Sequence, residues 1–395
     1  MQKSKKSLGL SARGVSRVAS SIGLACLTGM AMPAMAGKKL EIDDTRWVSI
    51  GAGLRTSFTS TEDASPNGKS RSTDFEVDSI RIYMAGQAHE NIKFTLNTEK
   101  IDDQVEVLDA IAQFEFSPEF NIWMGRMLTP ADRIEMNGPY YGLSWNQYTQ
   151  PLYPSDQNPV TRDAGALGRD EGVTVWGTKN KFQYAIGVFD GVNGFGNQDD
   201  DLLYAGRFAY NFLNMEDNPA YYTSSTYHGG LGNIFTLGVS FQQQKGGTGS
   251  DAESGDFSGY TVDLLSETVV SGGGVLTIEA EYKEFDADYT VATAPADLGT
   301  SGCFCLFDGD SSFLTVGYMF PAEFGVGKIQ PYVRIVENSP SDGDSSDLTE
   351  FGINYIISGH NARLNVNFSS GDATISGYKA ADDVDTISFG AQVQI

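Results

Sequence analysis

Residues 387 to 395 read ISFGAQVQI and end the chain. Successive side chains of an extended strand point to opposite faces. The apolar residues of this stretch share one face: Ile387, Phe389, Ala391, Val393 and Ile395. The polar residues and the glycine share the other: Ser388, Gly390, Gln392 and Gln394. The alternation predicts a strand between an apolar and an aqueous environment, as in a transmembrane β-barrel or in any half-exposed antiparallel sheet.

The opposite end of the chain predicts export from the cytoplasm. Five basic residues precede an apolar stretch from Ala19 to Met32, and Ala34-Met35-Ala36 follows it. This is the order of a secretory signal, with cleavage expected after Ala36. The apolar stretch is too short to cross a bilayer comfortably as a retained helix. We therefore expect a signal peptide over residues 1–36 and a mature domain over residues 37–395.

The composition excludes one class of partner and one class of membrane protein. The mature chain carries 22 Lys and Arg against 51 Asp and Glu, a formal charge of −29. So acidic a chain repels nucleic acid, and we expect no nucleic-acid partner. No run of 18 apolar residues follows the signal, which excludes a transmembrane helix in the mature chain. The 23 Phe and 18 Tyr residues argue against disorder.

Alternating segments of about ten residues recur through the mature chain, joined in turn by short and longer connections. Sixteen segments show this pattern: 47–58, 74–88, 92–100, 106–116, 121–127, 170–177, 182–189, 202–212, 234–245, 257–267, 275–285, 312–320, 328–337, 348–358, 362–368 and 384–395. The pattern predicts an all-β fold, a 16-stranded antiparallel transmembrane β-barrel in the bacterial outer membrane. A soluble β-sandwich also alternates, but its strands are shorter and its connections do not alternate in length.

The positions of the arginines test this prediction, because a charge at the lipid midplane costs about 2–4 kcal/mol. Five arginines lie opposite the apolar face of their segments: Arg55, Arg81, Arg207, Arg334 and Arg363. In the segment from Leu202 to Phe212, Arg207 and Asn211 alternate with aromatic residues. We therefore expect these arginines to line the inside of the barrel.

One connection is much longer than the others. Leu128 to Gly168 spans about forty residues without a clear strand and is rich in Pro, Tyr and Asn. A connection of that length usually has a function of its own. A sixteen-stranded barrel would otherwise enclose a wide aqueous lumen. We expect this third loop to fold into the lumen and narrow it.

Four stretches around this loop follow a specific order: LDAIAQFEF (108–116), WMGRMLTPADRIE (123–135), GRDEGVTVWG (168–177) and QYAIGVFDGVNG (183–194). In this order the chain resembles the phosphate-selective porin O and P family, over about a quarter of the mature chain. The resemblance implies a sixteen-stranded, trimeric outer-membrane channel whose third loop folds into the pore.

Phosphate selectivity does not follow from this resemblance. The family members that select phosphate use an arginine ladder and a cluster of lysines. Arg126, Arg133 and Arg169 fit the neighbourhood of such a ladder, but carboxylates are interleaved with them. The mature chain contains only 11 lysines. We therefore expect weak ion selectivity, leaning to cations at low salt, and no phosphate site of micromolar affinity.

We expect charges of the loop and of the wall to face each other across the constriction. The candidates are Arg55, Arg81, Arg126, Asp132, Arg133, Glu135, Asp156, Arg162, Asp163, Arg169 and Arg207. Opposed charges order water and dipolar solutes, and their balance sets the ion preference. The alternative is that these charges pair and only hold the loop in place. The expected function is a water-filled channel for passive diffusion of small hydrophilic solutes or ions.

Other classes of function have less support. An enzyme needs a nucleophile, a base and an orienting group, but His89, His228 and His360, the only histidines, map to the periplasmic turns. We expect no enzymatic activity, and no cofactor, since the C-x-x-C-H motif of c-type haem is absent. A barrel without a channel is the alternative, serving adhesion, scaffolding or as a sheath around a redox partner.

Two features stay open at this level. Cys303 and Cys305 either form a tight disulfide or remain free. The acidic connections, such as Asp199-Asp200-Asp201, have two possible roles. They bind divalent ions, as a calcium site or as a bridge to lipopolysaccharide, or they form a solvated surface that repels other negative charges. The partners expected are outer-membrane lipid, lipopolysaccharide and further copies of the chain in a homotrimer.

Overall fold

The computed structural model describes residues 38–101, 104–153, 168–216, 222–288, 303–379 and 383–395. All of them belong to one compact unit, Ala31–Ile395. The predicted signal peptide lies outside the described residues.

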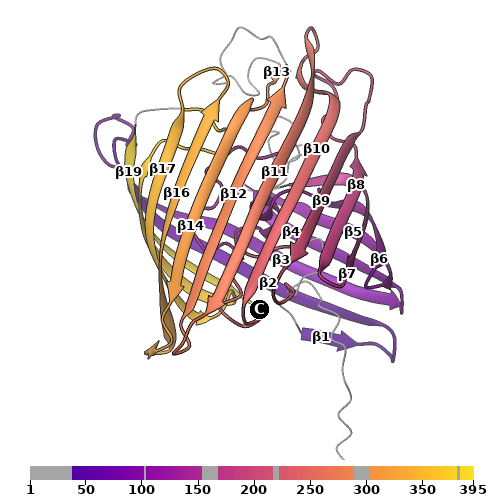
Figure 1. Cartoon of the computed structure of the whole chain (residues 1–395), viewed down its shortest axis with the longest axis horizontal. Helices are drawn as coiled ribbons and strands as arrows, with labels where there is room; N and C mark the ends of the chain where they lie inside the picture. The colour runs from indigo at the N-terminus through magenta and orange to yellow at the C-terminus, as the bar shows by residue number, and fades with distance from the viewer. Residues whose placement is uncertain (1–37, 102–103, 154–167, 217–221, 289–302, 380–382) are drawn as a thin grey trace, which may run out of the picture. The chain divides into compact units, whose positions relative to one another are not determined.

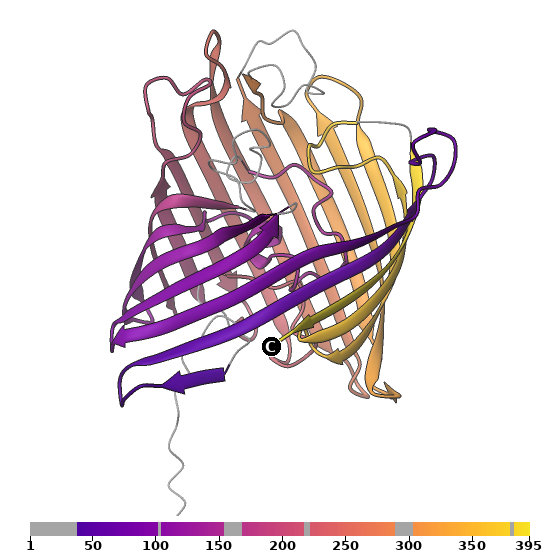
Figure 2. The same ribbon diagram turned by 180° about the vertical axis from the view of Figure 1, so that it is seen from behind.

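Sixteen antiparallel strands form a closed barrel, as predicted (Figures 1 and 2). They are β2 (Trp47–Thr61), β3 (Asp74–His89), β4 (Ile92–Ile101), β5 (Gln104–Ser117), β6 (Phe120–Leu128), β7 (Arg169–Lys179), β8 (Phe182–Phe189), β9 (Leu203–Asn211), β10 (Ile234–Ser250), β11 (Ser254–Val269), β12 (Val275–Ala287), β14 (Gly309–Met319), β16 (Gly327–Pro340), β17 (Ser346–Ser358), β18 (Ala362–Gly371) and β19 (Val384–Gln394). Each pairs with the next, and β19 closes the barrel on β2, with Phe389 opposite Phe58.

Three short strands and one short helix were not predicted, because they are too short to show a period. β1 (Lys38–Glu41) pairs with the start of β2, β13 (Cys303–Phe304) with the end of β10, and β15 (Glu323–Phe324) with the start of β16. Helix α1 (Arg133–Asn137) lies in the third loop. No helix among the described residues is long and apolar enough to cross a membrane.

The two faces of the wall differ sharply in chemistry. On β19, Phe389 and Val393 are each 52% exposed, whereas Ser388 and Gln392 are each 1% exposed. Most residues of the other strands follow the same rule, so the outer face is mainly apolar and the inner face is mainly polar. An apolar outer band of this extent would cause aggregation in water, whereas the hydrocarbon chains of a lipid bilayer would cover it. The chain is therefore an outer-membrane barrel.

The connections between strands also differ at the two ends of the barrel. The end that carries the C-terminus has short turns, such as the one from His89 to Ile92. Short turns are periplasmic in bacterial barrels, and the longer loops are extracellular. The β9–β10 connection, residues 212–233, is an exception, because it is long yet lies at the periplasmic end.

Replacing Leu314 by Arg tests the assignment of the outer face. Leu314 lies at the middle of β14, is 44% exposed and stands opposite Ile335. A charge near the lipid midplane should destabilise the folded barrel by about 2–4 kcal/mol. The change is measured as a lower urea midpoint for folding into lipid vesicles. Leu314→Met is the matched control, and equal midpoints for the two variants would contradict the assignment.

Candidate functional site

The inner face of the barrel is buried and rich in charge. Its buried ionisable residues include Arg55, Arg81, Glu99, Asp109, Arg207, Asp263, Glu267, Glu279, Glu281, Lys283, Arg334, Glu350 and Arg363. A buried charge is costly unless it is paired and hydrogen-bonded. Two segments outside the strands supply many of the partners. We call residues 129–153 the third-loop segment, and the described residues 212–216 and 222–233 between β9 and β10 the periplasmic connection.

Wall arginines bind the backbone of the third-loop segment. The carbonyl acceptors are those of Trp145 for Arg55 at 2.7 Å, of Asn146 and Gln147 for Arg334 at 2.9 and 2.8 Å, and of Gly142 for Arg363 at 2.6 Å. Glycines of the wall leave room for the aromatic rings of this segment. A Cβ at Gly390 would lie 2.4 Å from the Trp145 indole, and one at Gly53 would lie 2.9 Å from the Tyr140 ring.

The carboxylates at α1 converge on one wall lysine. Asp132 caps α1 by accepting from the N–H of Glu135 at 3.0 Å, and its other oxygen accepts from Lys283 Nζ at 2.6 Å. The same ammonium lies 3.2 Å from Glu281 and 4.0 Å from Glu135. Three buried carboxylates therefore surround one cation, and their combined charge exceeds that of Lys283.

Arg133 joins the third-loop segment to the periplasmic connection and to the wall. Its guanidinium donates to both oxygens of Glu216 at 2.6 and 2.8 Å and to the Ser224 carbonyl at 2.9 Å. Its Nε donates to Asp263 at 3.3 Å, and Asp263 also pairs with Arg207. Burial acts to lower the pKa of Arg133 and to raise that of Glu216. Their attraction outweighs burial, so the pKa of Arg133 is raised and that of Glu216 is lowered.

The structure thus brings four of the predicted residues into one network: Asp132, Arg133, Glu135 and Arg207. Three others lie elsewhere on the inner face. Arg55 stacks on Trp145, with the guanidinium carbon 4.1 Å from the ring centroid, Arg81 pairs with Glu99, and Arg169 pairs with Asp109 at 3.1 Å. Asp156, Arg162 and Asp163 lie outside the described residues.

The structure corrects the position predicted for Arg126. Arg126 stands opposite Ala110 on β5 and Glu171 on β7, and it pairs with Glu171 at 3.1 Å. Ala110 is in turn opposite Leu96, an exposed residue of the outer face. Side chains of a strand alternate between its two faces. Buried Trp123 points inward, so Arg126, three residues later, points outward. Arg126 therefore lies on the outer face, away from the network around Arg133.

The sequence did not reveal the role of the periplasmic connection. Its hydroxyl groups bind the wall and the third-loop segment: Ser225 donates to Glu279 and accepts from Asn137, each at 2.8 Å, and Thr226 donates to Glu267 at 2.7 Å. Ser225 and Thr226 are 0% exposed. The length of this connection could have indicated such a role, since the interval between Phe212 and Ile234 is much longer than the other periplasmic turns.

Two histidine rings pack together where the periplasmic connection meets the turn between β17 and β18. The ring centroids of His228 and His360 are 4.7 Å apart, and His360 Nε2 donates to the Thr226 carbonyl at 2.8 Å. Tyr141 packs edge-on against His360. Burial, with nearby Arg363, lowers the pKa of His360 to about 4, and burial beside His360 lowers the pKa of His228 still further below its ordinary value. Both rings are therefore neutral near pH 7.

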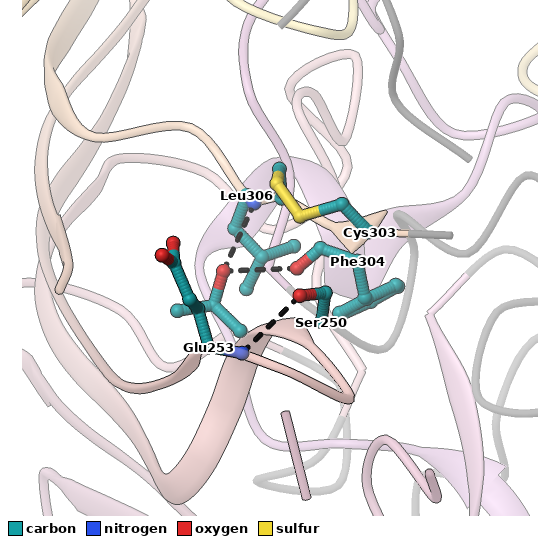
Figure 3. Close-up of a disulfide and its surroundings, with 7 residues drawn as sticks. Ser250, Glu253, Cys303, Phe304 and Leu306 are labelled. Carbon is teal, nitrogen blue, oxygen red and sulfur yellow. Dashed lines mark hydrogen bonds between the residues drawn. A yellow bond between two sulfur atoms is a disulfide. The ribbon is translucent and has the colours of Figure 1, made fainter. Parts of the chain in front are cut away.

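Cys303 and Cys305 form a disulfide at the extracellular end (Figure 3). The Phe304 carbonyl between them accepts from the Thr248 hydroxyl of β10 at 2.9 Å, and that hydroxyl accepts from the Leu306 N–H at 3.2 Å. The disulfide therefore belongs to a loop segment that is attached to the end of β10.

The acidic connections show no metal site within the described ranges. No group of three or more His, Cys, Asp or Glu side chains there is arranged to hold a metal ion. Lys245 lies 3.1 Å from Asp201 and 3.8 Å from Asp199 and offsets part of their charge.

Comparisons with known proteins support the fold. No family model and no curated protein matches the sequence. Among solved structures, the chain is similar to an anion-selective porin from Comamonas acidovorans, with a TM-score of 0.58 and 14% identity over 89% of this chain and 100% of that one. It is also similar to OmpF of Salmonella typhi (TM-score 0.56, 12% identity, 91% and 100%) and to OmpT of Vibrio cholerae (0.54, 14%, 91% and 100%). At these identities the likeness shows the barrel fold alone.

Replacing Arg133 by Ala tests the energetic role of the buried pair. Removing one partner of a buried ion pair costs about 3–5 kcal/mol, because the other charge stays buried. We expect that loss in the free energy of unfolding, measured by urea titration in lipid, and a partial recovery in Arg133→Ala with Glu216→Gln. Arg126→Ala, which breaks the pair on the outer face, should cost about 1 kcal/mol or less. Equal losses for the two single variants would contradict the network.

Acidification should loosen the periplasmic connection. Because the pKa of His360 is about 4 against an ordinary 6.5, the packed form binds fewer protons than an unpacked one. The packing is therefore fully stable above pH 6.5 and loses stability as the pH falls toward 4. We expect amide hydrogen exchange over residues 223–230, corrected for its intrinsic rate, to show larger opening in acid. Because both rings are neutral when packed, the double variant His228→Gln/His360→Gln should lose most of this dependence; the same dependence in this variant and in wild type would exclude the two histidines as its source.

Proposed function

We propose that the barrel is an outer-membrane channel through which small hydrophilic solutes or ions diffuse passively. The observation that carries this proposal is the density of ionisable side chains on the inner face. Charged groups inside a barrel are costly unless they are paired, so a barrel that served only as a scaffold would be more stable with an apolar interior. A sixteen-stranded wall is also wide enough for an aqueous path. The solved structures with the same fold include porins, which supports the proposal.

The third-loop segment would form the constriction of this channel. Its residues hydrogen-bond to inward side chains of strands on several sides of the barrel, including β2, β10, β12, β16, β17 and β18. We infer that the segment folds into the lumen. Arg55, Arg334 and Arg363 then act mainly as anchors, because each donates to at least one backbone carbonyl of the segment. The carboxylates around Lys283 are the better candidates for a filter.

The ion selectivity would be weak and would favour cations at low salt. The ladder candidates Arg133 and Arg169 are each paired with a carboxylate, which leaves them poorly available to an anion. The formal charge of −29 creates a negative field that attracts cations. Salt should weaken that field, since the Debye length falls from about 10 Å at 0.1 M to about 3 Å at 1 M. These pairings argue against a phosphate site of micromolar affinity.

The proposal has three further parts. The first 36 residues would be removed as a signal peptide on export. The channel would be a homotrimer, a form in which OmpT of Vibrio cholerae has been solved. The chain would have no enzymatic activity, since His228 and His360 are buried in packing contacts, which leaves them poorly placed to act as a general base.

One observation favours a barrel without a channel. Most of the third-loop segment and most charges of the inner face are almost completely buried, as are Glu216 and residues 224–226 of the periplasmic connection, so little water reaches them. A scaffold or adhesion barrel would have a filled interior of this kind. The two functions differ in whether the folded protein conducts ions.

Planar-bilayer recording decides between these functions. Purified, heat-modifiable protein should give discrete conductance steps, with a reversal potential in asymmetric KCl that indicates a slight cation preference at low salt. Micromolar phosphate should leave the current unchanged. Block by phosphate would instead favour phosphate selectivity, and absence of any conductance from folded protein would favour the non-channel barrel.

Shortening the third-loop segment tests its role as the constriction. Deleting residues 139–150 removes the carbonyls bound by the wall arginines and should raise the single-channel conductance several-fold. The control deletes residues 64–71, an exposed stretch of the β2–β3 loop, and should leave conductance unchanged. Unchanged conductance in the first variant, with the barrel intact, would mean that the segment does not narrow the path.

A further inference from the structure

The periplasmic connection and the third-loop segment enter the barrel from opposite ends and bind each other. The N–H of Thr223 donates to the Met136 carbonyl at 3.3 Å, and the N–H of Ser225 donates to the Tyr141 carbonyl at 3.2 Å. The Thr223 hydroxyl donates to the Arg133 carbonyl at 2.7 Å. The first two bonds join main chains, so they depend on the path of both segments rather than on a single side chain.

The periplasmic connection also reaches well-separated parts of the wall. Its contacts include Tyr222 with Trp123 of β6, at 5.9 Å between ring centroids, Gly229 with Glu267 of β11 at 2.7 Å, Ser225 with Glu279 of β12 at 2.8 Å, and His228 with His360 beside β18. Around the closed barrel, β6 and β18 are six strands apart by way of β2 and β19, and ten apart by way of β11 and β12. The connection therefore crosses the interior instead of following its rim.

The contacts of the periplasmic connection with the wall and with the third-loop segment are mainly polar. Glu267 alone accepts from the Thr226 hydroxyl and from the N–H groups of Tyr227 and Gly229. Glu216 is bound by Arg133 on one side and by the Tyr227 hydroxyl at 2.8 Å on the other. Water can replace hydrogen bonds of this kind when the groups separate, so a polar contact separates at lower cost than an apolar core of equal area.

We propose that the periplasmic connection is a plug, which docks on the third-loop segment and closes the channel from the periplasmic end. Solute crosses only while the plug is undocked. This inference rests on the proposed channel function, and it accounts for an interior that is charged yet buried. The part of the plug that carries the inference is residues 222–229, together with Glu216.

A reversible cross-link between the two segments tests the plug. Asn137 and Ser225 are joined by a side-chain hydrogen bond of 2.8 Å, so Cys residues at both positions should be linked reversibly, either directly as a disulfide or through a short thiol-specific reagent that bridges the two sulfurs by disulfides. We expect the oxidised N137C/S225C protein to conduct at least tenfold less than the same protein after reduction. The N137C and S225C single variants are the controls. Each retains the Cys303–Cys305 disulfide, so any effect of reducing that bond is measured separately.

A second variant tests the opposite change without a new covalent bond. Thr226→Val keeps the shape of the side chain and removes the hydroxyl that binds Glu267. We expect it to weaken docking and to raise the open probability of single channels several-fold. This variant keeps the proposal testable if the double-cysteine protein folds poorly.

The possible results separate the plug from the channel. Equal conductance of the oxidised and reduced double variant would overturn the plug and leave the channel function intact. Failure of the cross-link to form in folded protein, checked by mass spectrometry, would also overturn it, because the two residues would not be adjacent. Absence of conductance from the wild type, the single variants and the reduced double variant would overturn the channel function and the plug with it.

Discussion

Charge pairing inside the barrel is the constraint on which the rest of the structure depends. Lipid outside the wall requires apolar side chains there, and the two-residue period of a strand then directs the polar residues inward. Once inside, each charge needs a partner. Lys283 forms an ion pair with Asp132, beside α1, and Arg133 forms ion pairs with Glu216 and Asp263. The two non-strand segments are therefore part of the interior network.

The sequence predicts which face of a strand a residue occupies, because this depends on the local two-residue period. It predicts few of the contacts between residues that are far apart along the chain. The facing of β19, and the inward position of Arg55 and Arg207, follow from alternation alone. The outward position of Arg126 was missed, although Trp123 three residues earlier sets its face. The partner of Lys283 could not be predicted, because Asp132 is 151 residues away along the chain and only the closed barrel brings them together.

The same pairings bear on both the position of the third-loop segment and its chemistry. Wall arginines hold the segment mainly through its backbone carbonyls, and Arg55 also stacks on the ring of Trp145, which lies against Gly390. The acidic set around Lys283 is different, since three carboxyl groups there share one ammonium. In this view anchoring and filtering are performed by different residues, whereas the sequence suggested one set for both.

The central claim is that Arg133 holds the two segments together and thereby keeps the interior closed. Single-channel recording of the Arg133→Ala protein, beside wild type and Arg126→Ala, tests this claim most directly. The account predicts longer or larger openings in Arg133→Ala, because Glu216 and the Ser224 carbonyl lose their shared donor, and no change in Arg126→Ala. Openings in Arg133→Ala that match those of wild type, in a barrel shown to be folded, would contradict it.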